Sequence, residues 1–503
     1  MKTRYVSLMA VLSVFAAFIL PAVAQDRKAG FDFDDDGREV FFIDSIWYHL
    51  DSIQMKASVC NRSYWWEDPN YPEWRKEMVI PSTIMHNEQE YTVNEIEKYA
   101  FQYEAFETLS LPSTLTIMDN SEVCSLTNLI SITVDEKNPN FKAVDGVLYN
   151  KEMTSMLCYP KGKWDSGIVI PEGVKRLEHN LFIAGRYDKD DNNAKNYNIS
   201  FPSTLKSIGG GCFNKFRAKS FNLPDGLESI ESWAFESASS EDSTLVIPST
   251  VSWIGRNGFE SARFKRITLP DGLEIINEYT FYGCPLEEMT LPSTVKEIGE
   301  RAFEYTKSLK GIEFPGGIEK IGIEAFRQSG LKSVAIRLNI ERLDDDVFSY
   351  CDSLRQVVIG EDVFSIKESF TGCAALRDIY CEGMTPPRII SEYPLGVWKR
   401  NYIHGDPLPV FTGATVHVRP GAAKNYSGTR WKEIGPIVED LTDGVDEVGD
   451  DMAIGDDELC DAYSLSGATV ATWLRFGEVA TTLPKGLYIV RTASGKSAKI
   501  AIE

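Results

Sequence analysis

The chain has 503 residues, a formal net charge of −22 and 43% hydrophobic residues. This length exceeds what one hydrophobic core usually supports, so we expect several domains or a repeat array. The composition excludes wholesale disorder, and the negative charge disfavours nucleic acid or anionic lipid as a broadly held partner, because both need a basic face.

The first 24 residues have the features of a signal peptide. Lys2 and Arg4 precede an apolar run over residues 6–20, and residues 22–24 form a small-x-small cleavage site. No cysteine stands at this site, so a lipid anchor is not indicated. No later stretch reaches the roughly 20 apolar residues that cross a bilayer. The sequence therefore predicts an exported protein, extracellular or at the outer cell surface, with no transmembrane segment in the mature chain.

Residues 25–78 are expected to form an N-terminal β cap, because the open end of a repeat array exposes apolar edges and unpaired strand groups. Within this cap, a dense aromatic group occupies a polar stretch that contains proline. Exposed aromatic side chains bind sugars or protein partners, whereas packed ones cover the end of an array, and both interpretations stay open here. This aromatic loop is one candidate ligand-binding site: Tyr64, Trp65, Trp66, Tyr71 and Trp74.

A repeat governs the middle of the chain. Six prolines that follow an apolar residue are separated by 22, 24, 22, 22 and 23 residues. A phenylalanine stands eleven residues after each of them, and the register continues without proline at Arg337 and Gly360. The prolines and their phenylalanines are Pro202 with Phe213, Pro224 with Phe235, Pro248 with Phe259, Pro270 with Phe281, Pro292 with Phe303, and Pro315 with Phe326.

The repeat is less regular before residue 200. Pro171 and Phe182 keep the same offset, whereas Pro112 places Val123 in the phenylalanine position. The longer gaps between these turns predict insertions: a hairpin over residues 138–149 with Asp-Gly as its turn, and a solvated loop over residues 186–198.

Each repeat has the pattern of two short extended segments and a turn. In the segment that ends at Pro292, Leu286, Met289 and Leu291 mark an inward face and Thr290 points outward. Proline ends this strand because it lacks a backbone donor. Gly299 then turns the chain, and Phe303 returns to the core. A unit this small cannot bury its apolar side alone, so the units must stack into a continuous core.

The pattern Leu-x-x-Ile-x-Leu-Pro-x-x-Val-x-x-Ile-x-x-x-Ala-Phe resembles the BspA-like (Treponema pallidum-type) bacterial leucine-rich repeats, with the clearest copies at 286–303 and 309–326. The segment 415–420, with Tyr426 and Trp431, resembles the segment that closes such arrays. The expected fold is mainly β: a leucine-rich-repeat solenoid of about ten to eleven turns over residues 79–382, a C-terminal cap of the array over 383–438, and a small β module. The family implies secreted or surface-exposed proteins with adhesive or host-interacting roles in some members, but no fixed ligand.

The C-terminal region consists of an acidic linker, residues 439–458, and a small β-sandwich-like module, residues 459–503. The run Leu-Pro-Lys-Gly-Leu-Tyr-Ile-Val-Arg from Leu483 resembles the C-terminal sorting domain of type IX secretion cargo. That resemblance implies a partner in the secretion machinery and a tail that is either removed or retained as an anchor. The alternative is an ordinary small β-domain.

No motif for catalysis, a cofactor or a metal stands out. The five histidines are scattered, and Asp32, Asp34 and Asp36 imitate a calcium loop whose twelfth position is Ile43 instead of glutamate. The cysteines lack C-x-x-C spacing, and Cys284, Cys351 and Cys373 each follow a repeat phenylalanine by three residues, which indicates buried structural thiols.

A second candidate site is the column of outward strand positions, which solenoids often present as an extended ligand face. The alternative is a plain solvated sheet face. The column, in chain order, is Asn222, Val246, Thr268, Thr290, Glu313, Ala335, Val358 and Tyr380.

The sequence thus favours a non-catalytic binding or adhesion module for an extracellular protein or glycan. A structural surface spacer or assembly element without a foreign ligand is the main alternative, and an enzyme with an unrecognised site is the least favoured.

Overall fold

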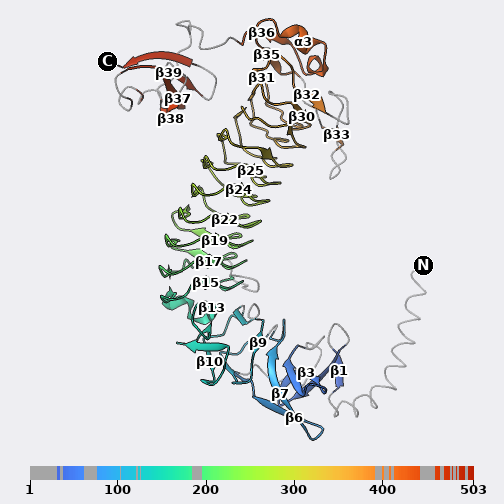
Figure 1. Cartoon of the computed structure of the whole chain (residues 1–503), viewed down its shortest axis with the longest axis vertical. Coiled ribbons are helices and arrows are strands. Elements are labelled where there is room, and N and C mark those ends of the chain that lie inside the picture. Colours follow the sequence, from blue (N-terminus) through green and yellow to red (C-terminus); the bar gives the residue numbers. More distant parts are fainter. Residues whose placement is uncertain are drawn as a thin grey trace, which may run out of the picture. The chain divides into compact units, whose positions relative to one another are not determined.

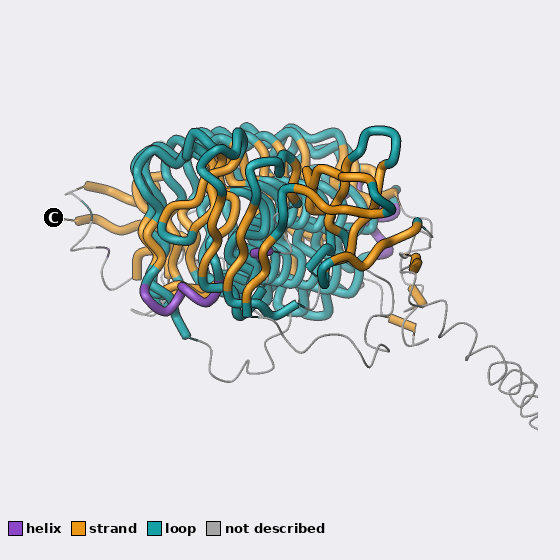
Figure 2. The backbone as a smooth tube through the Cα atoms, turned by 90° about the horizontal axis from the view of Figure 1, so that it is seen from below, coloured by secondary structure: helices purple, strands orange, loops and turns teal. Residues whose placement is uncertain are grey.

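The structure, a computed structural model, describes residues 31–33, 38–61, 76–101, 104–119, 123–124, 126–183, 195–390, 399–400, 407–408, 413–441, 459–464, 469–475, 479, 483, 486–492 and 497–502. The chain divides into two compact units, Met1–Phe213 and Asn214–Glu503. Strands and loops make up nearly all of the described backbone (Figure 2), and the protein is a mainly β solenoid as the sequence predicted.

The first unit begins with a mixed sheet in the order β1-β2-β3-β4-β7-β6, with β9 beside β7. Alternate residues of β3 and β4 point inward, so Tyr48, Ala57 and Val59 are fully buried. The strands are β1 (Phe31–Phe33), β2 (Glu39–Ile43), β3 (Ile46–Asp51), β4 (Lys56–Val59), β6 (Thr83–His86), β7 (Gln89–Ile96) and β9 (Ile117–Met118). All neighbours are antiparallel except β4 with β7 and β7 with β9.

Parallel pairing takes over in the rest of the first unit. Strands β5 (Glu77–Val79), β8 (Thr108–Leu111) and β10 (Ser131–Val134) form one parallel sheet. The expected insertion hairpin is confirmed: β11 (Phe141–Val144) pairs antiparallel with β12 (Val147–Asn150), and Asp145 and Gly146 both have the positive φ that this tight turn requires. Parallel pairs then follow among β13 (Ser155–Cys158), β15 (Arg176–Leu177) and β17 (Ser207–Ile208), and between β14 (Ile168–Val169) and β16 (Ile199–Ser200), with a 3-10 helix η3 (Lys161–Ser166) between β13 and β14.

The second unit stacks short parallel strands turn upon turn (Figure 1). The first strands of its turns include β21 (Thr244–Val246), β23 (Arg266–Thr268), β27 (Ser333–Ile336), β29 (Gln356–Ile359), β31 (Asp378–Cys381), β35 (Thr415–Val418) and β36 (Ile437–Glu439). The second strands are β19 (Ser229–Ile230), β22 (Trp253–Ile254), β24 (Ile275–Ile276), β25 (Glu297–Ile298), β26 (Lys320–Ile321), β28 (Arg342–Leu343), β30 (Ser365–Lys367) and β32 (Arg388–Ile390). The short parallel pair β18 (Arg217–Ala218) with β20 (Ser239–Ser240) also belongs to the array. Strands β33 (Lys399–Arg400) and β34 (Pro407–Leu408) form a separate antiparallel pair.

The core of the second unit contains a column of stacked phenylalanine rings. Each repeat phenylalanine is buried, and successive rings lie nearly parallel with centroids 5.0–5.7 Å apart. Offset-parallel stacking at this spacing adds to the stabilisation from burial. The rings belong to Phe235, Phe259, Phe281, Phe303, Phe326, Phe348 and Phe370. This is the continuous core that the repeat predicted.

The number of turns differs from the sequence prediction. The solenoid has about 13 turns instead of ten to eleven. The prolines and phenylalanines could not reveal two of them: β10 pairs in parallel with β8, and β35 with β31, although neither strand is followed by the repeat proline and phenylalanine. Backbone pairing extends the stack where the side-chain signature is missing.

At the C-terminal end, α3 (Ala423–Ser427) and a 3-10 helix η5 (Arg430–Glu433) lie between β35 and β36. The C-terminal module contains β37 (Leu459–Ser464), β38 (Thr469–Arg475), β39 (Gly486–Thr492) and β40 (Ser497–Ile502). Within its described residues these four strands form one antiparallel sheet, in the order β38-β37-β39-β40, where a sandwich-like pair of sheets was expected. The expected signal peptide and most of the acidic linker lie outside the described residues.

Candidate functional site

The outward column of the second unit follows from strand alternation. In β29, Val357 and Ile359 are buried and Val358 between them is half-exposed. In β31, Ile379 and Cys381 are buried in the same way on either side of Tyr380. The side chains that point outward at the equivalent positions of the other turns are Asn222, Val246, Thr268, Thr290, Glu313 and Ala335.

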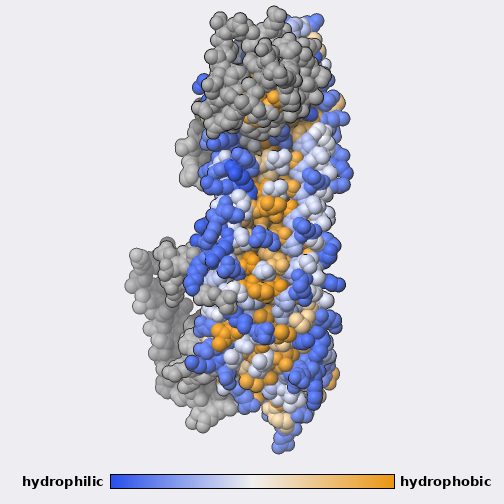
Figure 3. Space-filling model, turned by 90° about the vertical axis from the view of Figure 1, so that its left-hand side faces the viewer, coloured by the Kyte–Doolittle hydropathy of each residue, from blue (hydrophilic) through white to orange (hydrophobic). Residues whose placement is uncertain are grey.

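Ladder pairing brings these residues into line. Val246 pairs with Thr268 in one parallel pair, and Ala335, Val358 and Tyr380 are direct register partners on consecutive turns. The column is therefore an aligned row of side chains, and its members include apolar, hydroxyl, acidic and aromatic groups. One face of the stacked turns also carries a band of hydrophobic residues bordered by hydrophilic ones (Figure 3). The aromatic loop of Tyr64, Trp65, Trp66, Tyr71 and Trp74 lies outside the described residues.

The column continues beyond Tyr380 to a histidine between two carboxylates. His417 is the register partner of Tyr380, and their rings stack with centroids 4.5 Å apart. Its Nδ1 lies 2.9 Å from both carboxylate oxygens of Asp440, and its Nε2 lies 3.3 Å from Oδ1 of Asp378. Both ring nitrogens of His417 therefore lie within hydrogen-bonding distance of a carboxylate oxygen.

The sequence places residues 415–420 in the segment that closes the array but gives no sign of this cluster. His417 reaches Tyr380 only because β35 adds to the sheet after a long excursion of the chain. The excursion is fixed by two buried aromatic residues: the Tyr426 hydroxyl donates to the carbonyl of Gly383 at 2.8 Å, and the Trp431 Nε1–H donates to the carbonyl of Pro387 at 2.8 Å.

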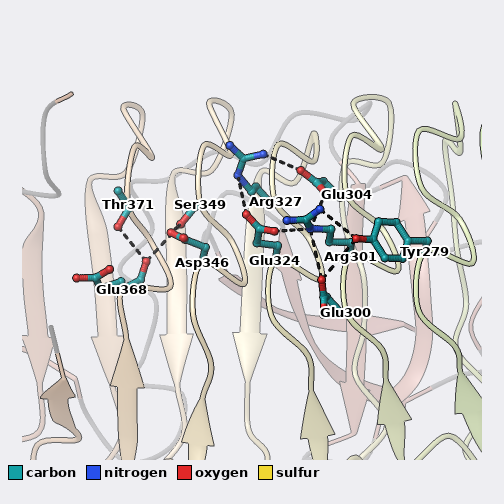
Figure 4. A network of polar contacts seen from close by, with 10 residues as sticks. All are labelled: Tyr279, Glu300, Arg301, Glu304, Glu324, Arg327, Asp346, Ser349, Glu368 and Thr371. Atoms are coloured by element: carbon teal, nitrogen blue, oxygen red, sulfur yellow. Dashed lines mark hydrogen bonds and ion pairs between the residues drawn. The ribbon is translucent and has the colours of Figure 1, made fainter. Parts of the chain in front are cut away.

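Polar side chains close in sequence to the repeat phenylalanines of the second unit form a network (Figure 4). Arg301 pairs with Glu324, and its guanidinium also donates to the Tyr279 hydroxyl at 3.0 Å. Arg327 donates to Glu304 at 2.7 Å. Because each arginine contacts an acidic residue of the neighbouring turn, the network ties consecutive turns together.

The electrostatics of this network fit a structural role. Burial raises the pKa of Glu304, whose side chain is only 3% exposed, even though the hydrogen bond from Arg327 acts in the opposite direction. Partial burial disfavours the charge of Arg301, but the hydrogen bond and charge of Glu324 outweigh it and raise the pKa of this guanidinium. The arginines and carboxylates satisfy one another. The positions of these residues within the repeat can be read from the sequence. The residue types at equivalent positions differ from turn to turn, however, so the sequence does not indicate the network.

The cysteines of the repeat are buried as the sequence indicated. The Sγ of Cys284 donates to the carbonyl of Phe259 at 2.9 Å, and that of Cys373 donates to the carbonyl of Phe348 at 3.0 Å. Burial raises the pKa of the Cys284 thiol. A thiol of this kind is a poor nucleophile and a poor metal ligand, because both roles need the thiolate.

In the part of the chain that the structure describes, no group of three or more His, Cys, Asp or Glu side chains is arranged to hold a metal ion. There is also no helix in that part with the length and apolar character needed to cross a membrane.

Stacked turns of short parallel strands around an aromatic core define a leucine-rich-repeat solenoid. The BspA type leucine rich repeat region matches the chain in six copies, over residues 83–155, 191–310 and 274–385. These segments cover more than half of the 503 residues, so the chain belongs to the BspA-type leucine-rich repeat family. No curated protein matches it.

Several solved structures are similar to this chain. A leucine-rich repeat protein from Bacteroides ovatus is 18% identical, with 80% of this chain and 100% of that chain covered and a TM-score of 0.35. The pneumococcal vaccine antigen PcpA is 15% identical, with 80% and 99% covered and a TM-score of 0.40. A leucine rich cell surface protein from Faecalibacterium prausnitzii is 16% identical, with 70% and 95% covered and a TM-score of 0.29. The family assignment rests on the repeat match.

Proposed function

We propose that this protein is an exported, non-catalytic solenoid that binds an extracellular protein or glycan through the outward column of its second unit. The observation that carries the proposal is the aligned row Ala335, Val358, Tyr380 and His417 on consecutive turns. A row of this kind presents the same edge of every turn to a partner, so contacts can add along an extended ligand. Its alternation of apolar, aromatic and polar groups suits a protein or glycan surface better than a single small molecule.

Export is part of the proposal, and it is supported by the basic start, apolar run and cleavage site within residues 1–24. The C-terminal module, residues 459–503, would then serve as a sorting tail recognised by the secretion machinery. Pulse labelling of the native host, followed by mass spectrometry of both chain ends in the culture fluid, tests both parts. A product that begins at Gln25 supports export, and an intact N-terminus inside the cell contradicts it.

Binding is tested by applying the full-length protein to arrays of glycans and extracellular-matrix proteins. Saturable binding to at least one array member supports the proposal. If the folded protein binds none of them, the proposed binding function fails for these two partner classes.

The competing function is a structural spacer or assembly element. It is favoured by the regularity of the second unit, whose stacked phenylalanines and paired arginines stabilise the array itself. Analytical ultracentrifugation distinguishes the two: concentration-dependent self-association without any bound foreign ligand favours the spacer.

A further inference from the structure

Four exposed basic side chains lie in line on consecutive turns of the second unit. Each directly follows a buried leucine, and a strand begins at the next residue after Lys332, Arg355 and Arg377. Backbone hydrogen bonds join the four residues in order: the N–H of Lys332 donates to the carbonyl of Lys310 at 2.9 Å, that of Arg355 to Lys332 at 2.8 Å, and that of Arg377 to Arg355 at 3.0 Å. We refer to Lys310, Lys332, Arg355 and Arg377 as the basic column.

The charges of the basic column are not neutralised as those of the preceding turns are. Upstream, Lys265 and Glu287 occupy equivalent positions of adjacent turns and form an ion pair at 2.9 Å. The hydrogen bond and charge of Lys265 lower the pKa of Glu287, with smaller contributions from the charges of Arg266 and Lys310. Beyond Lys310, no carboxylate of the described chain forms an ion pair with Lys332, Arg355 or Arg377. Three successive cations therefore face solvent without a paired carboxylate in a chain whose net charge is −22.

The residues beside the basic column are polar rather than aromatic. Ser333, Gln356 and Asp378 are direct register partners on the side toward the outward column, and all three are half-exposed. The Ser333 hydroxyl and the Gln356 amide can exchange hydrogen bonds with sugar hydroxyls, and the Asp378 carboxylate, which lies 3.3 Å from His417 Nε2, can accept them. Tyr380 is the one aromatic residue of strands β27, β29 and β31, and each of these strands is fully described.

We propose that the basic column binds a linear sulfated polysaccharide along the stacking direction. Adjacent strands lie about 4.8 Å apart, so the four cations span about 14 Å in a single row. A polymer with sulfate groups on successive sugars presents its charges in a matching row, and the guanidinium fork suits oxyanions of this geometry.

Other polyanions fit this surface less well. A nucleic acid duplex needs a broad basic face, which the acidic chain does not offer, and a single strand needs a row of aromatic side chains on which its bases stack. The inference rests on the proposed binding function and names the class of ligand that this part of the face takes.

The test uses the full-length protein and heparin oligosaccharides as the probe, with chemically desulfated heparin as the matched ligand control. The column variant carries Lys332→Glu, Arg355→Glu and Arg377→Glu. The control variant carries Lys142→Glu, Lys320→Glu and Lys432→Glu, three exposed lysines elsewhere, and has the same net charge. Thermal unfolding of both variants verifies that they remain folded.

We expect the wild-type protein to bind heparin and not its desulfated form. The column variant should lose at least about tenfold in affinity, and the slope of log affinity against log salt should fall by about two. The control variant should lose much less. Absence of heparin binding by the wild type, equal losses in both variants, or tighter binding of single-stranded or duplex DNA than of heparin would each overturn the inference. If the wild type binds a matrix protein or neutral glycan but not heparin, the proposed binding function stands and only this inference fails.

Discussion

The phenylalanine positions are filled differently in the two units of the chain. In the second unit the rings of Phe281, Phe303 and Phe326 stack on consecutive turns with centroids 5.2 and 5.0 Å apart. In the first unit Phe182 and Phe213 stack in the same way, but the position after Pro112 holds Val123, which is buried without a ring. The turns of the second unit recur every 22 or 23 residues from Pro248 to Gly360, whereas insertions separate those of the first unit.

The first unit compensates with polar side chains that hold its insertions to the turns. Asn138 is fully buried; its Nδ2 donates to the carbonyls of Pro112 at 2.7 Å and Leu115 at 2.9 Å. Its Oδ1 accepts from the backbone N–H groups of Asn140 at 2.9 Å and Phe141 at 2.8 Å. The comparison shows that equal spacing allows a repeated apolar contact to stabilise the stack, whereas an insertion needs specific hydrogen bonds at its own site.

The largest effect on stability is expected at the centre of the column of stacked phenylalanine rings. Phe303→Ala removes a fully buried ring between two others and should lower the free energy of unfolding of the second unit by about 3–5 kcal/mol. The corresponding change in the first unit, Val123→Ala, should cost about 1–2 kcal/mol. Hydrogen exchange followed in each unit at increasing urea concentration measures both changes in the free energy of unfolding. Each unit is followed separately because a repeat array need not unfold in one step. Equal losses would contradict the contrast between the units.

The next largest effect on stability is expected from Asn138→Ala, which removes a buried polar side chain of the first unit. It leaves two carbonyls and two N–H groups without their partner, and we expect a loss of about 2–3 kcal/mol confined to the first unit. Asn140→Ala serves as the control, because this exposed side chain makes a single hydrogen bond, to the Thr116 carbonyl at 2.9 Å. The same urea titration compares the two variants. A loss for Asn138→Ala no larger than that of the control would show that the polar contacts do not hold the insertion.

A smaller effect on stability is expected at a glycine where two neighbouring turns approach one another closely. A Cβ on Gly299 would lie 2.6 Å from the backbone nitrogen of Glu278 on the preceding turn, whereas the nearest atom to a Cβ on Gly272 is 3.9 Å away. Gly299→Ala should therefore cost about 1–3 kcal/mol through forced separation of the turns. Gly272→Ala, measured by the same thermal unfolding experiment, should be close to neutral. Similar melting temperatures for both variants would argue against close stacking at this turn.

The smallest expected effect is on how the free energy of unfolding depends on pH, and it has opposite signs in the two units. Glu97 of the first unit accepts from His49 at 2.8 Å and from Arg38 at 3.1 Å. Burial acts against its charge, but these partners prevail and lower its pKa below 4.5. Its stabilisation is therefore present above pH 4.5 and is lost as the pH falls through the lowered pKa.

Glu304 of the second unit behaves in the opposite way. Burial raises its pKa, so its ionised form is disfavoured in the folded state, and stability is gained as the pH falls through the raised pKa toward 4.5. Glu97→Gln should reduce the loss of stability of the first unit as the pH falls. Glu304→Gln should remove the gain in stability of the second unit over the same pH range. Hydrogen exchange between pH 3 and pH 7 distinguishes the units; a Glu97→Gln curve parallel to that of the wild type would contradict the assigned sign.

Much of the fold could be predicted because local sequence determines it. Strand alternation around Thr290, the phenylalanine at each turn and the Asp145-Gly146 hairpin all depend on residues that are close in the chain. The missed turns at β10 and β35 depend on backbone pairing with strands that lie far away in sequence, and no side-chain period reports it. The His417 cluster was missed for the same reason, since Asp378 and Asp440 reach this ring only through the sheet register.

The candidate binding surface was only partly accessible from the sequence. The outward column follows from alternation alone, and the structure adds its extension to His417. The basic column requires knowledge of which lysines and arginines already have carboxylate partners. Lys265 and Lys332 occupy equivalent positions, but Lys265 has its partner Glu287 and Lys332 has no such carboxylate among the described residues.

The most direct test of the account is to measure, on glycan and matrix-protein arrays, how two matched full-length variants bind. One carries Thr268→Arg and Thr290→Arg on the outward column, and the other carries Ser252→Arg and Ser293→Arg at exposed positions outside it. The first variant should lose the saturable binding of the wild type, and the second should retain it. Equal binding by the two variants, with both folded, would contradict the claim that the outward column is the binding surface.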